Sequence, residues 1–144
     1  MILLVCALGL IALSIALGLF HKTPWTISPA EKARKNPLSA SEVNLTAARA
    51  VYGEKCANCH GDKGKGDGSD AMMYDPAPSD LTDATQIGKL TDGAIFYQIT
   101  EGRKPMPSFR KKLTDEQRWQ LVLLVRELAA GRASLPTQKQ EEKK

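Results

Sequence analysis

Apolar residues fill the start of the chain without interruption by charge. Residues 1–20, MILLVCALGLIALSIALGLF, contain no acidic or basic side chain. A helix of this length spans about 30 Å, the thickness of a bilayer's hydrocarbon core. The pattern predicts a single transmembrane helix over 1–20 that anchors the chain in a lipid bilayer. A cleaved signal peptide is the alternative, although the basic n-region is absent and the apolar run exceeds the usual apolar core of such peptides.

Polar and charged residues replace this apolar run over 21–45. Prolines at 24, 29 and 37 interrupt the segment. Prolines among polar residues predict an extended, semi-rigid linker over 21–45. Trp25, near its start, belongs either at the membrane interface or in packing against the following domain.

Three later segments place apolar residues at helical spacing behind an N-capping threonine. With their expected caps, they are 46–56 (Thr46), 91–102 (Thr91) and 114–131 (Thr114). In the last segment, Gln117 completes a capping box with Thr114. The glycine-rich stretch 61–70 and the proline-containing stretch 75–81 predict loops. No segment shows the alternation that is typical of a strand.

Composition agrees with one folded domain plus appendages. The chain has 144 residues, of which 42% are apolar, as in folded proteins. We expect an all-α domain over 46–130 and a polar, mobile tail over 131–144. The formal net charge of +4 is scattered among acidic stretches, so it does not form the basic stripe that nucleic-acid binding needs. We expect no nucleic-acid partner.

The hexapeptide CANCHG at 56–61 holds two of the chain's three cysteines and one of its two histidines. A C-x-x-C pair followed directly by His is the attachment motif of c-type haem. It predicts thioether bonds from Cys56 and Cys59 to one covalent haem c, with His60 as a ligand of the haem iron. A domain of about 85 residues with short helices buries little apolar surface by itself, so we expect haem to hold it together.

Five segments in a fixed order extend this motif. They are VYGEKCANCHG, the GKGDG loop, PAPSDL, TDGAIFYQITEGRKPMPSF and LTDEQRWQLVLLVREL. Together they resemble class I c-type cytochromes of the bacterial membrane-anchored, monohaem kind, over about 46–130. The resemblance implies the class I cytochrome c fold, in which short helices surround one covalent haem, here preceded by the single N-terminal transmembrane helix.

Two signals disagree about the side of the membrane on which the haem domain lies. Basic residues follow the apolar span and none precedes it, so charge counting would place the domain in the cytoplasm. In the proteins that this chain resembles, however, haem is attached after export. A single span with an almost chargeless N-terminus has little charge bias to overcome. We therefore expect a single-pass protein of the inner (cytoplasmic) membrane with its haem domain on the periplasmic side.

Three methionines inside the expected domain compete for the sixth position on the iron. Met106 stands in KPMPS, where two prolines restrict the backbone, and the resemblance places the axial methionine there. Met72 and Met73 follow the attachment motif in a flexible segment, where packing against haem is the more ordinary role. The expected iron ligands are His60 and Met106, with the other two methionines or an open position as alternatives.

Further residues are expected to contact haem or to hold its ligands. The resemblance implies that His60 donates its ring N–H to a backbone carbonyl in the loop near Pro78, with Pro76 as the competing position. The aromatic residues that would pack either on haem or in the core are Tyr52, Phe96, Tyr97, Phe109 and Trp119. Of these, we assign Tyr52, Phe96 and Phe109 to the cofactor-binding set.

The expected ligand pair decides the expected function. A His/Met pair favours ferrous iron and leaves no position for an incoming molecule. We therefore expect one-electron transfer, without enzyme activity and without a small-molecule substrate. The expected partners are membrane redox complexes, with electrons passing from a quinol-oxidising complex to a terminal oxidase or photosynthetic reaction centre. The chain would act free or as a haem subunit of such a complex; the alternative is a haem enzyme or gas sensor with an open sixth iron position.

Basic residues bracket Met106 in the sequence. They are Arg103, Lys104, Arg110, Lys111 and Lys112. Solvated surface charge is the default interpretation of such a group. If the group lies around the haem rim, it would steer a partner of opposite charge.

Overall fold

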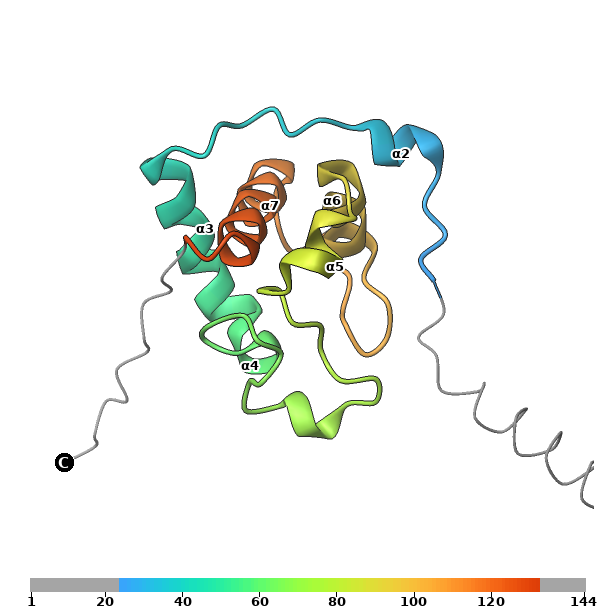
Figure 1. Ribbon diagram of the computed structural model, residues 1–144, viewed down its shortest axis with the longest axis vertical. Coiled ribbons are helices and arrows are strands. Elements are labelled where there is room, and N and C mark those ends of the chain that lie inside the picture. The colour runs from blue at the N-terminus through green and yellow to red at the C-terminus, as the bar shows by residue number, and fades with distance from the viewer. Residues whose placement is uncertain (1–23, 133–144) are drawn as a thin grey trace, which may run out of the picture.

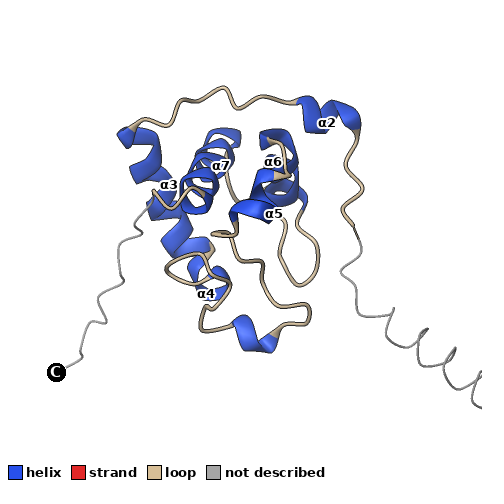
Figure 2. Cartoon of the chain, viewed as in Figure 1, coloured by secondary structure: helices blue, strands red, loops and turns tan. Residues whose placement is uncertain are grey.

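The computed structural model describes residues 24–132, which form helices joined by loops and contain no strand (Figure 2). The elements are α2 (Pro29–Ala33), α3 (Glu42–Lys55), α4 (Ala57–His60), the 3-10 turn η2 (Ala71–Met73), α5 (Ala84–Gly88), α6 (Asp92–Glu101) and α7 (Asp115–Ala129). The prediction of an all-α domain of short helices is confirmed for this part of the chain.

Helix α7 lies at the centre of the domain. In Figure 1 it stands between α3 and α6, and it packs against both. Every side chain from Arg118 to Val125 is buried, so α7 is covered on more than one face. Helix α3 contributes Leu45, Ala48 and Tyr52, whose spacing of three or four residues gives a helix one buried face.

The limits of α6 and α7 match the capping signals in the sequence. The Thr91 hydroxyl accepts the amide N–H of Ala94 at 3.1 Å, and Gly102 ends α6 with a φ of 62°. Thr114 and Gln117 form the capping box that begins α7. Both predicted helices are therefore confirmed, because a cap is a local signal that the sequence displays directly.

Helix α3 begins earlier than predicted. The expected cap, Thr46, lies inside the helix, and the observed cap is Ser41, whose hydroxyl accepts the amide N–H of Asn44 at 3.4 Å. Leu45 is buried, so the apolar face of α3 starts before Thr46. The prediction of this N-terminus was wrong because the burial of Leu45 results from tertiary packing, which the local sequence does not show.

Residues 24–38, which we call the strap, lie along α6 and α7 rather than forming an extended linker. Helix α2 occupies the middle of the strap and packs against α6 (Figure 1). A Cβ atom at Gly93 would lie only 2.0 Å from the carbonyl oxygen of Glu31, so this close backbone approach requires glycine. Asn36 donates from Nδ2 to the carbonyl of Trp119 at 3.0 Å. These partners are distant in sequence, which is why the prolines alone suggested a linker.

Helix α5 is a short element that the periodicity of the sequence did not predict. Asp83 caps it through its side chain. Arg126 of α7 holds the end of α5 in place, donating to the carbonyls of Ile87 at 2.9 Å and Leu90 at 2.6 Å. The same guanidinium donates to the carboxylate of Asp92 at 2.8 Å. A side chain 36 to 39 residues away in the chain therefore positions α5.

No helix within residues 24–132 combines the length and apolar content needed to cross a bilayer. The predicted anchor over 1–20 lies outside the described residues, as do residues 21–23 of the predicted linker and residues 133–144 of the predicted tail. These three predictions remain predictions.

Candidate haem site

The CANCH motif lies where α3 meets α4. Cys56 ends α3 by donating its amide N–H to the carbonyl of Tyr52 at 2.8 Å, and its own carbonyl accepts the amide N–H of His60 at 2.9 Å. The motif is therefore a single helical turn that follows directly on α3 (Figure 1). Cys56 and Cys59 are both half-buried, and neither forms a disulfide.

The His60 ring is oriented by the loop that contains the two prolines. Its Nδ1 lies 3.0 Å from the carbonyl oxygen of Ser79. A carbonyl oxygen can only accept, so Nδ1 carries the proton and Nε2 keeps the lone pair that binds a metal. The resemblance implied an acceptor in the loop near Pro78, with Pro76 as the competing position, and the observed acceptor is the carbonyl of Ser79, directly after Pro78. A haem contact of Pro78 itself stays a prediction.

Two glycines allow the loop after His60 to pack closely against the backbone of Pro78 and of α4. Gly66 has a φ of +78°, and a Cβ there would lie 2.6 Å from the carbonyl oxygen of Pro78. A Cβ at Gly68 would lie 2.2 Å from the carbonyl oxygen of Asn58 in α4. Any larger residue at either position would push backbone away. The glycine-rich loop thus holds the segment of Ser79 next to α4.

Tyr52 supports the motif from inside the domain. Its side chain is buried and its hydroxyl donates to the carbonyl oxygen of Gly61 at 2.8 Å. Burial raises the pKa of the Tyr52 hydroxyl, and nearby negative groups add to the effect, so the residue stays a neutral donor. Burial also raises the pKa of the Cys56 thiol to about 12, with a further contribution from Cys59. This poorly solvated environment suits an uncharged thioether better than a thiolate.

Met106 lies in a tight loop that joins α6 to α7. It forms an isolated antiparallel bridge with Arg103. At the base of the loop, the Ser108 hydroxyl donates to the carbonyl of Thr100 in α6 at 2.7 Å. Met106 is half-buried and packs against the core. In Figure 1, the loop and α4 both lie toward the lower part of the molecule, with the segment that leads into α5 between them.

The competing methionines occupy a different environment. Met72 and Met73 belong to η2 and are 98% and 69% exposed, respectively. Neither side chain is packed in the protein core. The structure therefore sets Met106 apart from the other two, since only Met106 combines partial burial with a loop that is closed at its base.

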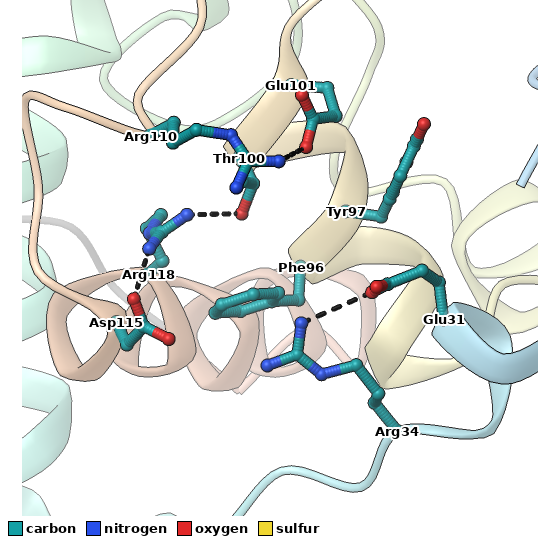
Figure 3. A pocket seen from close by; sticks show the side chains of 9 residues that line it. All are labelled: Glu31, Arg34, Phe96, Tyr97, Thr100, Glu101, Arg110, Asp115 and Arg118. Atoms are coloured by element: carbon teal, nitrogen blue, oxygen red, sulfur yellow. Dashed lines mark hydrogen bonds and ion pairs between the residues drawn. The ribbon is translucent and has the colours of Figure 1, made fainter.

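Phe96 packs between α6 and α7. It is 2% exposed, and its ring stacks on Trp119 with 4.0 Å between ring centroids. The guanidinium carbons of Arg34 and Arg118 lie 4.4 and 5.0 Å from the Phe96 centroid. Figure 3 shows the ring beside a cavity of about 150 Å³, where every arginine is paired with a carboxylate. The pairs are Arg34–Glu31, Arg110–Glu101 and Arg118–Asp115.

The described contacts of Phe96 are those of core packing, and its direct contact with haem stays a prediction. Tyr97 contacts Trp25, with the rings edge to face and 6.3 Å between centroids. Phe109 is 5% exposed and follows Met106 by three residues. For Phe109 and Tyr52, direct contact with haem stays a prediction.

The residues present fit a covalent haem and its iron. Two cysteines stand on one turn, beside a histidine whose Nδ1 is committed to a carbonyl and whose Nε2 keeps its lone pair. A thioether sulfur is available from a separate loop. Within residues 24–132, no group of three or more His, Cys, Asp and Glu side chains is arranged to hold a metal ion by itself.

Comparison with known proteins agrees with this site. Residues 43–125 match the model of the family described as cytochrome c oxidase, cbb3-type, subunit III. Cytochrome c6 of Thermosynechococcus vestitus is 30% identical over 92 residues, covering 64% of this chain and 77% of that protein. Cytochrome c6 of Synechococcus elongatus is 31% identical over 87 residues, covering 60% of this chain and 93% of that protein.

One solved structure extends the comparison to the fold. A chain of the Kuenenia stuttgartiensis reducing HAO-like protein complex Kustc0457/Kustc0458 superimposes with a TM-score of 0.55 at 30% identity. The match covers 76% of the present chain and 52% of the Kuenenia chain, so the similarity spans about half of that longer protein.

Proposed function

This chain belongs to the cytochrome c family described as subunit III of cbb3-type cytochrome c oxidase, and from that premise we propose that it carries single electrons between membrane redox complexes. As a class I c-type cytochrome it holds covalent haem c through the CANCH motif. The proposal adds that His60 and Met106 would be the two side chains that bind the iron. The observation that carries the proposal is the hydrogen bond from His60 Nδ1 to the Ser79 carbonyl oxygen. This hydrogen bond leaves the lone pair of Nε2 available to bind iron.

The side chains of the site suit electron transfer more than chemistry on a substrate. When bound, haem c supplies an iron that changes valence by one electron. His60 is held in one tautomer by Ser79 and has no proton to transfer at Nε2. The Met106 thioether is uncharged and has no proton either, and such a sulfur donor favours the ferrous state. His60 and Met106 would therefore hold the iron through a change of valence with no ligand exchanged.

The family description favours an oxidase as the electron acceptor. It names a subunit of cytochrome c oxidase, and the Kuenenia chain is part of a protein complex. We therefore propose that electrons pass from a quinol-oxidising complex through this chain to a terminal oxidase. Delivery to a photosynthetic reaction centre is the competing route. Mixing the reduced, haem-loaded chain with each purified acceptor distinguishes the two routes, and oxidation by neither would contradict both.

We further propose that residues 1–20 anchor the chain in the inner membrane with the haem domain on the periplasmic side. Only residues 21–24 would then separate the span from Trp25, which contacts the domain. Four extended residues reach at most about 14 Å, so the domain would stay at the membrane surface. Alkaline carbonate should leave the full chain in the membrane pellet, and protease should reach the domain in spheroplasts. Release by carbonate, or protection from protease, would contradict this arrangement.

Charge near the Met106 loop should govern docking. Lys104, Lys111 and Lys112 are exposed, whereas Arg110 pairs with Glu101. We expect the second-order rate of electron transfer to a partner to fall severalfold or more as salt rises, because screening weakens steering. A Lys104→Glu/Lys111→Glu variant should be slower at low salt and less sensitive to salt.

The matched control for this test changes an exposed lysine on the strap. Like the double variant, Lys32→Glu makes the net charge more negative, but at a site on α2. Stopped-flow measurement of haem oxidation at several ionic strengths compares the three proteins. A wild-type rate that does not respond to salt would contradict docking through the basic residues, as would an equal effect per charge from Lys32→Glu.

A further inference from the structure

The strap reaches from the core of the domain to the loop of Met106. Its central part is fixed, because the α2 backbone rests on Gly93 and the Arg34 guanidinium lies over the Phe96 ring. Ile27, between α2 and Trp25, is buried. These contacts leave the N-terminal end of the strap little freedom, so the position of Trp25 is set by the fold.

Trp25 is in contact with two segments at once. Its ring meets Tyr97 of α6 edge to face, with centroids 6.3 Å apart. The guanidinium carbon of Arg103 lies 4.3 Å from the Trp25 centroid, within the range of a cation–π contact. Trp25 and Arg103 are both only partly exposed, and desolvation strengthens such a contact. Trp25 therefore ties the start of the Met106 loop to the side of α6.

Arg103 is also the residue that pairs with Met106. The two form the antiparallel bridge that closes the loop, and a Cβ at Gly102 would lie 2.4 Å from the carbonyl group of Pro107. The turn is therefore too tight for Arg103 to shift without moving its bridge partner. A restraint on the Arg103 side chain thus also restrains the backbone at Met106.

We propose that Trp25 is a positioning residue for Met106, acting through Arg103 to hold the methionine loop closed against the iron. The inference rests on the proposed function in one respect, since it takes Met106 as an axial ligand. It assigns a redox role to a residue outside the matched segment 43–125. Through Trp25, the strap then influences the position of Met106, the proposed ligand that raises the reduction potential of the iron.

The test uses the full-length, haem-loaded chain and compares wild type with Trp25→Ala. In the oxidised state, imidazole can bind iron only after the Met106 sulfur has left, so its binding rate at saturating imidazole reports opening of the loop. Loss of a partly buried cation–π contact should raise this rate about three- to tenfold. The near-infrared sulfur–iron charge-transfer band should weaken, and the reduction potential should fall.

Three further variants separate positioning from general destabilisation. Trp25→Phe keeps an aromatic face and should restore most of the wild-type behaviour. Arg103→Ala should itself speed imidazole binding, and Trp25→Ala added to it should have no additional effect if Trp25 acts through Arg103. Leu45→Ala removes a buried side chain from α3, which packs against α7, and should lower stability without altering imidazole binding.

Each outcome bears on a different part of the proposal. Imidazole rates in Trp25→Ala equal to wild type, with the sulfur–iron band intact, would overturn the role of Trp25 and leave the proposed function standing. Equal acceleration by Leu45→Ala, or full additivity of Trp25→Ala and Arg103→Ala, would also overturn it. Absence of the band in wild type would overturn the assignment of Met106, and with it both proposals.

Discussion

Replacing Met106 with Leu should abolish the sulfur–iron charge-transfer band and lower the reduction potential by on the order of tenths of a volt. Axial ligands move haem potentials over a range of about 0.8 V, and a methionine sulfur raises the potential. Leucine has nearly the volume of methionine, so the packing cost should stay below about 1.5 kcal/mol. Loss of the sulfur–iron bond adds to this cost, but the fold should survive. Potentiometric titration, together with near-infrared spectra of the oxidised protein, measures both effects.

The other methionines provide the matched control. Met72 and Met73 are largely exposed on η2, so a Met72→Leu/Met73→Leu variant should keep the band and a potential close to that of wild type. The three methionines share one chemistry and differ in their surroundings. If the double variant lost the band and Met106→Leu kept it, the ligand would be a methionine of η2. That result would contradict the assignment of Met106.

Replacing Phe96 with Ala should lower the free energy of unfolding by about 3–5 kcal/mol. The ring is 2% exposed and stacks on Trp119, and the guanidinium carbons of Arg34 and Arg118 lie 4.4 and 5.0 Å from its centroid. Its removal leaves a cavity between α6 and α7, and the Arg118 guanidinium loses its contact with the ring. Denaturant unfolding of the haem-loaded protein, followed by circular dichroism, measures the change.

Phe109 is the comparison that separates core packing from haem contact. It is nearly as buried as Phe96, at 5% exposed, but follows Met106 in the chain. Both alanine variants should be destabilised. The haem spectrum of folded Phe96→Ala should match wild type, whereas that of Phe109→Ala should shift. An equal spectral shift in Phe96→Ala would instead indicate that Phe96 also contacts haem.

Local signals in the sequence predicted the elements that depend on neighbours in the chain. The caps of α6 and α7 are formed by residues three positions apart, and the CANCH motif is one turn long. Helix α5 was missed because its five residues are too few to show a helical pattern of apolar positions, although Asp83 caps it. Its end is also held by Arg126, far along the chain. The start of α3 was missed because burial of Leu45 depends on tertiary packing.

The same distinction applies to the site. The family resemblance indicated the loop that orients His60, but it did not specify which carbonyl turns toward the ring, and the acceptor is Ser79. The sequence named Phe96 and Trp119 among the aromatics of haem or core packing without showing that the two rings stack on each other. The strap was described as a linker because Gly93 and Asn36 make contacts that no local pattern contains.

The most direct test of the central claim is carbon monoxide titration of the reduced, full-length haem protein without denaturant. With His60 and Met106 on the iron, no position is open, and the spectrum should stay unchanged at saturating carbon monoxide. Formation of a stoichiometric carbon monoxide complex would show an open sixth position. That result would contradict the electron-carrier account and favour a haem enzyme or gas sensor.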